Sequence, residues 1–370
     1  VEKFAVTQGT LSFDNLAVSA DGSRLSVPSL LITAPSWTDY QQFNDKVTVT
    51  VEIENSLIRS STVRRCIGLP DCGLTAEEVS LTYDGKVNDF KAWIGSARIG
   101  RTEIVADAHV KGATDLRSAQ FDIKALNFAT TPDQVHGIFR SVFAKELPEK
   151  VSEYLDRFET IEIDASASGN IDAAAVTVAA VTDLGSADIN GNITLADGRT
   201  AFDGTVEADS FDAGKLLAIA DLGQVSFSAE GAADIGKKYV DARGKAAVDK
   251  IIWHGYEYRD IKLDGTYADD ILRAAVSSDD PNMAFDLDGT LDLSWLEPQY
   301  NVVLNIQKAD FAATGLSHDR NRQSWLSCNV EASGEGSSLD YLVGRGTVNN
   351  FLYVSGTDTL TTELVKDRKS

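Results

Sequence analysis

Histidine and cysteine, the residue types best suited to catalysis or metal binding, are scarce in this chain. The four histidines stand at 109, 136, 254 and 318, and no two have the close spacing that is typical of a metal site. No Gly-x-Ser-x-Gly sequence is present to hold a nucleophilic serine on a sharp turn. We therefore expect no enzyme activity, no catalytic residue and no bound cofactor.

An acidic stretch from Asp286 to Glu297 has a partial likeness to a calcium-binding loop. Such a loop needs glycine at its sixth position and a carboxylate or amide at its fifth, where this chain has Leu291 and Thr290. Alternation also places Asp286 and Asp288 on the polar face of a strand. We expect no metal site here.

Two cysteines, Cys66 and Cys72, flank a short segment that contains Gly68 and Pro70. A turn at these residues would bring the two sulfur atoms within bridging distance. Connectivity cannot be read from sequence, so a disulfide and a pair of thiols in a loop both remain open. Cys328 lies in an apolar stretch and is predicted to be a small buried residue.

Composition limits the partners. The 370 residues include 34 Lys and Arg and 56 Asp and Glu, which gives a net charge of −22. This balance disfavours nucleic acid and anionic membrane surfaces as partners. The hydrophobic fraction of 43% is ordinary for a folded chain. The sequence starts at Val1 rather than at Met, so we expect a piece of a longer protein. It has no apolar run long enough to span a bilayer, which means only that this piece has no such anchor.

Alternation of apolar and polar residues dominates the chain and predicts half-buried strands. The clearest runs are at 46–54, 160–164, 260–264, 284–288 and 301–306. Asp21-Gly22, Asp84-Gly85 and Asp197-Gly198 are typical of tight hairpin turns. Strands joined by short turns predict an all-β fold built as an antiparallel meander.

Glycine recurs inside these predicted strands, in phase with the apolar positions. Strand glycines usually mark a bend or a close approach, so the repetition predicts a sheet that is bent along a line around an apolar trough. The recurring glycines are Gly169, Gly191, Gly204, Gly265, Gly289 and Gly346. For some of them a position in a turn remains an alternative.

One segment, from Thr131 to Phe158, has helical periodicity instead. Thr131, Pro132 and Gln134 form a helix-start pattern with a capping box, and Pro148 predicts a kink. We expect a kinked helical pair that covers the open end or face of a sheet. A membrane-lying helix is disfavoured because the polar side mixes acidic with basic residues. A shorter helix is expected at 212–217.

The later part of the chain, from about 125 to 353, resembles the TamB branch of the AsmA-like family, in the form found in Bacteroidetes-type bacteria. The matching segments are LNFATTPD at 126–133, LP at 147–148, DLGSA at 183–187, FDAGKLL at 211–217, GYEYRDIKLDG at 255–265, SDDPN at 278–282, FDLDG at 285–289, ADF at 309–311 and GL at 315–316. These motifs are structural and name no catalytic residue.

The resemblance implies an extended antiparallel curved sheet that forms a hydrophobic groove, with phospholipid acyl chains as cargo. It implies a periplasmic location, as part of an inner-membrane-anchored protein that bridges to the outer membrane, and a BamA-like barrel protein as partner. The chain would then serve intermembrane phospholipid transport and outer-membrane biogenesis. We divide it into an N-terminal β segment (1–128), a helical insertion (129–160) and a C-terminal β-groove segment (161–370).

Alternation places a set of apolar residues on one sheet face, which we predict to line the groove. Two other functions remain open: a β-scaffold that binds barrel clients by strand augmentation, and a structural module in which the same residues form a closed core. The predicted groove residues are Ile261, Leu263, Tyr267, Phe285, Leu287, Leu291, Val302, Leu304 and Ile306.

Overall fold

The computed structural model describes residues 1–67, 73–115, 117–143, 146–196, 198–236, 239–317, 324–336 and 343–369. It separates into two compact units, Val1–Asp183 and Leu184–Ser370. The predicted helical insertion falls inside the first unit, and the predicted boundary at residue 161 lies before the point where the two units meet.

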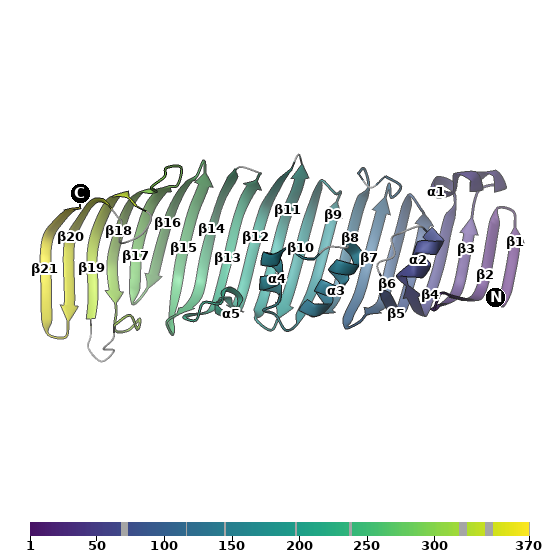
Figure 1. The fold of residues 1–370 in the computed structure, drawn as a ribbon, viewed down its shortest axis with the longest axis horizontal. Coiled ribbons are helices and arrows are strands. Elements are labelled where there is room, and N and C mark those ends of the chain that lie inside the picture. Colours follow the sequence, from purple (N-terminus) through teal and green to yellow (C-terminus); the bar gives the residue numbers. More distant parts are fainter. Residues whose placement is uncertain are drawn as a thin grey trace. The chain divides into compact units, whose positions relative to one another are not determined.

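Unit 1 is a curved antiparallel meander (Figure 1). Each pairing within it joins strands that are consecutive in the sequence, and in the described residues no pairing joins β1 to β10, so the sheet stays open. Its strands are β1 (Lys3–Thr7), β2 (Thr10–Ala20), β3 (Ser23–Thr33), β4 (Thr48–Arg59), β5 (Thr75–Lys86), β6 (Asp89–Ile99), β7 (Thr102–Lys111), β8 (Gln120–Thr130), β9 (Ile161–Gly169) and β10 (Ala173–Thr182).

Unit 2 repeats this construction. Its pairings are again antiparallel and between consecutive strands. Its strands are β11 (Gly185–Ala196), β12 (Arg199–Asp212), β13 (Leu222–Ile235), β14 (Val240–Trp253), β15 (Tyr256–Ala268), β16 (Ile271–Asp280), β17 (Met283–Asp292), β18 (Gln299–Asp310), β19 (Ser324–Glu335), β20 (Val343–Ser355) and β21 (Asp358–Lys369). The all-β prediction is therefore confirmed. The predicted alternating runs lie in strands, except that Lys46 ends α1, Val47 precedes β4 and Thr160 precedes β9.

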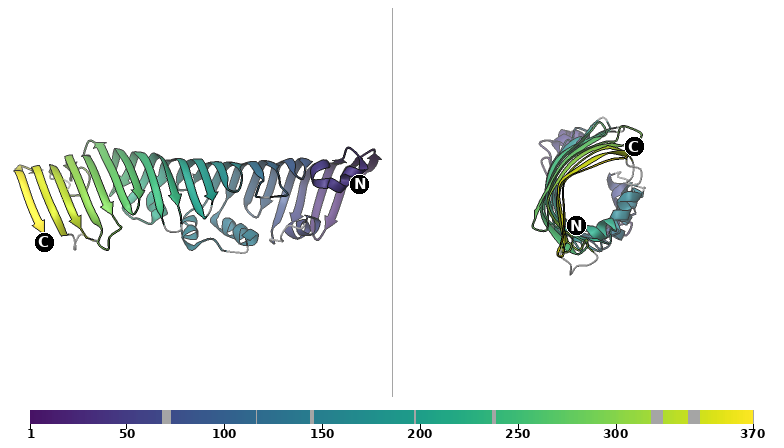
Figure 2. Two further views of the ribbon diagram at one scale, coloured as in Figure 1. Left: turned by 90° about the horizontal axis from the view of Figure 1, so that it is seen from above. Right: turned by 90° about the vertical axis from the view of Figure 1, so that its left-hand side faces the viewer.

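The helical insertion consists of α3 (Pro132–Phe143) and α4 (Glu149–Leu155), with Pro148 at the start of α4. In the end-on view of Figure 2, these helices lie on the open side of the curved sheet of unit 1. The predicted short helix is α5 (Ala213–Leu217). Sequence analysis did not predict η1 (Trp37–Gln42), α1 (Phe43–Lys46) or α2 (Ser60–Ile67), because none contains enough turns for a clear apolar stripe.

The hairpin prediction at Asp84-Gly85 is wrong. Both residues lie inside β5, where they pair with Thr50 and Val49 of β4. The chain reverses later, since Lys86 pairs with Asp89. Gly85 has a φ of +134°, so a glycine is needed here for an irregular strand position and not for a turn. Asp21-Gly22 does form the β2–β3 turn, and Gly198 lies in the β11–β12 turn next to Asp197, which is outside the described residues.

Few side chains are fully buried. Among the described residues only ten hydrophobic side chains fall in the buried class, and in unit 2 these are Leu184, Tyr258, Ala309 and Cys328. Three of these four, Tyr258, Ala309 and Cys328, lie in β15, β18 and β19. The apolar face of the sheet is therefore not the interior of a closed core.

Candidate functional site

All nine predicted groove residues lie on one face of unit 2. Register shows this directly, because residues opposite each other on paired strands share a face. Strand β16 links the set: Val276 pairs with Leu263 on one side and with Leu287 on the other. In the same way, Leu272 pairs with both Tyr267 and Leu291. On the other side of β17, Leu287 pairs with Leu304 of β18, so β18 presents its apolar residues on the same face.

One cross-strand row on this face is apolar without interruption. It runs over ten strands, or nine interstrand spacings of about 4.8 Å, which is about 43 Å. A corresponding row in unit 1, from Phe4 through Val51 to Val176, is apolar over all ten strands. The row in unit 2 consists of Ile189, Val206, Ala229, Ala246, Leu263, Val276, Leu287, Leu304, Val330 and Val348.

This apolar face is open rather than filled. None of the nine predicted residues is in the buried class; eight are half-buried, and Leu263 is 42% exposed. Within unit 2 the described residues include a single helix, α5, which is only five residues long. A closed core would bury most of these side chains almost completely. The structural-module alternative therefore lacks the packing that it requires.

A line of glycines bends the sheet toward the apolar face. Gly191, Gly204, Gly231, Gly244 and Gly265 are opposite one another on β11 to β15. A Cβ atom added at Gly204 would lie 2.2 Å from the backbone oxygen of Asn190, and one added at Gly231 would lie 2.6 Å from that of Arg243. Strand glycines at which neighbouring backbones approach closely are typical of a sheet that bends toward the face on which they lie. The apolar face is therefore the concave face.

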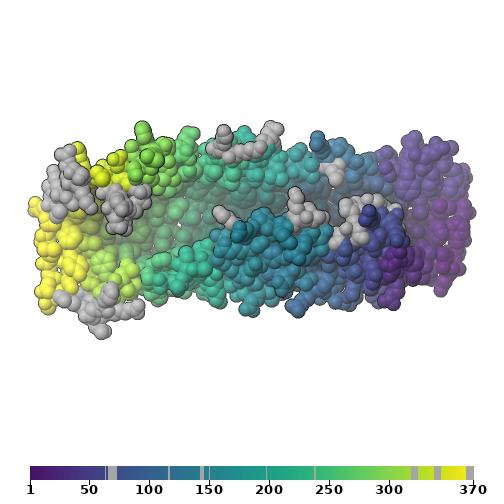
Figure 3. All heavy atoms as spheres, viewed as in Figure 1, coloured from purple at the N-terminus to yellow at the C-terminus, as the bar shows by residue number. Residues whose placement is uncertain are grey.

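The close approach varies along the sheet, since it is absent at Gly265, Gly289 and Gly346 but present again at Gly334 of β19, where an added Cβ would lie 2.1 Å from the Val343 backbone oxygen. At Gly265 the nearest atom to an added Cβ is 3.4 Å away, at Gly289 it is 3.5 Å away, and at Gly346 nothing lies within 4 Å. Gly169 ends β9 with a φ of +142°, so it occupies a turn position. Figure 3 looks onto the open side, and in unit 2, coloured green to yellow, a hollow lies between raised edges.

The apolar face also carries a small pocket of about 290 Å³. Ala229, Ala242 and Ala246 line it on β13 and β14, and Leu263, Tyr267 and Leu272 line it on β15 and β16. Alanine side chains here leave room next to the bend, whereas the neighbouring strands carry larger side chains. The Tyr267 hydroxyl donates to Asp270 Oδ1 at 3.1 Å, so the polar end of this side chain is already satisfied.

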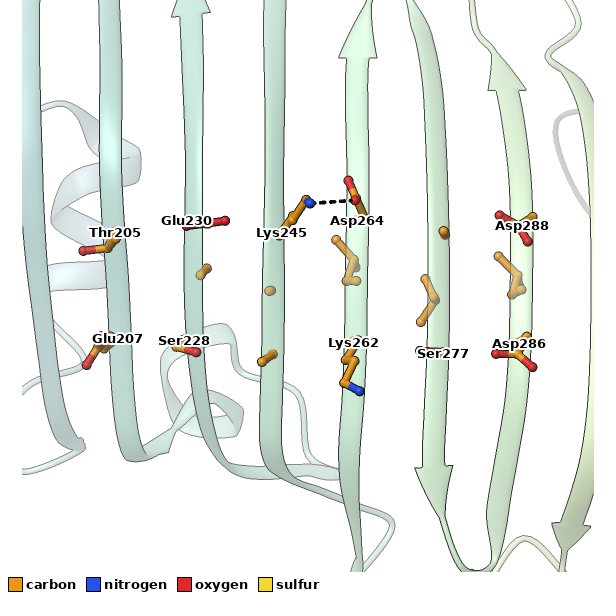
Figure 4. A pocket seen from close by; sticks show the side chains of 17 residues that line it. Thr205, Glu207, Ser228, Glu230, Lys245, Lys262, Asp264, Ser277, Asp286 and Asp288 are labelled. Carbon is orange, nitrogen blue, oxygen red and sulfur yellow. Dashed lines mark ion pairs between the residues drawn. The ribbon is translucent and has the colours of Figure 1, made fainter.

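The opposite face is polar and carries two rows of charged and hydroxyl side chains (Figure 4). A shallow groove of about 590 Å³ lies between the rows. Lys245 Nζ is 3.5 Å from Asp264 Oδ2, and both side chains are mostly exposed, so this ion pair adds little stability. Among the described residues no cluster of three or more histidine, cysteine or acidic side chains is arranged to hold a metal ion. We interpret this face as the solvated exterior.

Sequence analysis missed a second line of distortion, at which non-glycine residues adopt left-handed backbone. In the strands of unit 2 these residues are Ser210, Asp260 and Asn350, with φ values from +50° to +53°. Each lies inside a strand, and the register shifts beside Ser210. The Ser210 amide donates to Ser226 Oγ at 2.9 Å, which satisfies the backbone group freed by the shift. Asn, Asp or Ser inside an alternating run was the available signal.

A buried carboxylate stabilises the corner where β15, β16 and β17 meet. Asp280 is 1% exposed. Its Oδ1 accepts hydrogen bonds from the Tyr256 hydroxyl at 2.8 Å and the Asn282 amide at 2.8 Å, and its Oδ2 accepts one from the Arg259 amide at 3.1 Å. A carboxylate with this many donors is well satisfied despite burial. Its role is to fix the hairpin end rather than to do chemistry.

The cysteine predictions have different outcomes. Cys72 and the side chain of Cys66 lie outside the described residues, so the disulfide stays a prediction. Cys328 is buried, as expected, and burial raises the pKa of its thiol. A thiol that stays protonated is a poor nucleophile.

Comparisons with protein-family models, with curated proteins and with solved structures found no match. In the part of the chain that the structure describes, no helix is both long and apolar enough to cross a bilayer.

Proposed function

We propose that the concave apolar faces of the two units hold lipid acyl chains, and that the chain is part of a TamB-like protein that carries phospholipid between membranes. Periplasmic location, a longer membrane-anchored protein and a BamA-like barrel partner belong to this proposal and depend on the sequence resemblance.

The proposal rests on one observation: the apolar row across ten strands of unit 2 is not buried in a core. Each methylene group kept from water is favourable by roughly 0.8 kcal/mol, so an acyl chain along this face gains stabilisation over its whole length. Exposed apolar area of this extent is unusual unless something binds to it. The polar outer face, with its excess of carboxylates, would keep such a loaded sheet soluble.

Strand β18 offers a matched pair of positions for a test. Leu304 lies in the apolar row, and Val303, next to it and 50% exposed, belongs to the opposite face. A photo-crosslinking amino acid is placed at each position in turn, and the protein is irradiated in cells that contain labelled phospholipid. We expect labelled lipid at Leu304 and not at Val303. Equal labelling at the two positions, or none at Leu304, would refute a lipid-binding concave face.

A further inference from the structure

A polar cleft lies in unit 1, at the start of helix α3. Its volume is about 700 Å³. Three separate segments form it: the β6–β7 turn at Arg101, the first two turns of α3, and residues 156–159 after α4. The Gln134 side chain holds two of these walls together, because its Oε1 accepts from the Arg101 amide at 3.3 Å. The capping box predicted for Gln134 is therefore replaced by a contact with a different element.

A second contact fixes the third wall. His136 Nε2 is 2.7 Å from Asp156 Oδ1, which joins α3 to the segment after α4. The cleft thus has a defined shape on a helical pair that lies on the open side of the sheet of unit 1 (Figure 2).

Some of the charged side chains that line the cleft, of both signs, form no ion pair with the described residues. In the described part of the chain, the Arg101 guanidinium has no ion-pair partner, and neither do the carboxylates of Asp133 and Glu159. A guanidinium binds phosphate with fixed geometry, and carboxylates bind ammonium groups. The set therefore matches a ligand that carries a phosphate and an ammonium group a short distance apart.

Gly137 keeps the cleft open. It lies inside the 12-residue helix α3, where glycine costs about 1 kcal/mol of helix stability relative to alanine. Its backbone gives no reason for glycine, since a Cβ added there would meet nothing within 4 Å. Any larger side chain at this position would instead extend into the cleft, of which Gly137 is a lining residue.

We infer that this cleft binds the headgroup of a zwitterionic phospholipid, with Arg101 on the phosphate and with Asp133 and Glu159 on the ammonium group. The choice of a lipid as the source rests on the proposed function. Binding of the headgroup itself is independent of the apolar faces and can be measured without acyl chains.

The test uses the full chain and glycerophosphoethanolamine, a soluble headgroup without acyl chains, followed by phosphorus NMR titration. Inorganic phosphate and ethanolamine are titrated separately. The variants are G137W, which fills the cleft, G137A as its matched control, and R101Q. We expect wild type and G137A to bind the headgroup, and G137W and R101Q to bind it about tenfold more weakly, as loss of a charged hydrogen-bond partner predicts.

Several results would overturn the inference. They are equal affinities of G137W and G137A, an R101Q variant that binds as wild type does, and inorganic phosphate that binds as tightly as the headgroup. Circular dichroism of G137W checks that α3 is intact, and R101Q provides a test that does not alter the helix. Headgroup binding without lipid crosslinking at Leu304 would refute the proposed function but not the headgroup site. Lipid crosslinking at Leu304 without headgroup binding would refute only the headgroup site.

Discussion

The glycine line makes a graded prediction about stability, which begins with Gly204→Ala on β12. The new Cβ would lie 2.2 Å from the Asn190 oxygen and 2.6 Å from the Gly191 Cα, both of which are backbone atoms of β11. Neither atom can rotate away, so the two backbones must separate by about 1 Å. Overpacking of this kind costs about 1–3 kcal/mol of unfolding free energy.

Two other glycines on the same face serve as matched controls. Gly265→Ala would place its Cβ 3.4 Å from the Arg273 oxygen, which is an ordinary contact, and Gly346→Ala would meet nothing within 4 Å. Alanine restricts the unfolded chain more than glycine does. We therefore expect Gly265→Ala to be close to neutral and Gly346→Ala to be neutral or stabilising by up to about 1 kcal/mol.

Urea unfolding followed by far-ultraviolet circular dichroism measures the three variants against wild type. The expected order of midpoints places Gly204→Ala clearly lowest and Gly346→Ala highest. If Gly204→Ala unfolded at the same urea concentration as Gly265→Ala, the close approach of β11 and β12 would not be a real constraint. The argument that glycines bend this sheet would then fail.

Three further predictions follow from the site and its corner. Leu287→Asp should leave the fold intact, because the side chain is only half-buried, and it should abolish lipid crosslinking at Leu304. A fall of several kcal/mol in the free energy of unfolding would instead indicate a closed core. Asp280→Ala should lower the unfolding free energy by about 3 kcal/mol or more, since the Tyr256 hydroxyl and three backbone amides lose a buried acceptor; a thermal melt like that of wild type would contradict this. Hydrogen bonds from Ser294 and Trp295 lower the pKa of Asp292 below its ordinary value of 3.8. The ionised Asp292 therefore stabilises the fold above pH 3.8, and this stabilisation is lost as the pH falls through the lowered pKa. The acid-induced drop in melting temperature should be smaller in Asp292→Asn than in wild type, and an equal drop would count against these hydrogen bonds.

Strand positions were predictable because alternation is a local signal. Runs such as 301–306 encode both the strand and the face on which each residue lies, and the structure places Val302, Leu304 and Ile306 as this pattern requires. The hairpin at Asp84-Gly85 was mispredicted because a dipeptide cannot report that its neighbours continue to pair. An Asp-Gly pair is compatible with a turn but does not require one. Whether the chain reverses there depends on how far the residues continue to pair with the neighbouring strand.

The glycine pattern was only partly informative for a different reason. Gly204 and Gly346 look alike in sequence, yet one meets backbone at 2.2 Å and the other meets open space. The difference depends on how sharply two strands fold toward each other, which is a property of the pair. The left-handed residues Ser210 and Asp260 were missed likewise, since their cost is offset by partners on other strands, such as Ser226.

The cleft on α3 could not be predicted from sequence at all. Arg101 and Glu159 are 58 positions apart, and the pattern at the start of the helix suggested a cap rather than a contact with the β6–β7 turn. Gly137 was the one local clue, since it interrupts a helical stripe without a conformational reason.

The pairing of each strand only with its sequence neighbours makes each unit a nearly one-dimensional assembly. In such an array, stability is a sum of terms for each strand and for each interface between neighbours. Removal of an internal pair of strands would then cost three interfaces, create one new interface, and leave distant strands unaffected. Evolution could lengthen or shorten such a sheet by duplication of hairpins without redesigning a shared core. Damage would also stay local: a strand pair that opens exposes its own segment of the apolar face while the rest remains folded.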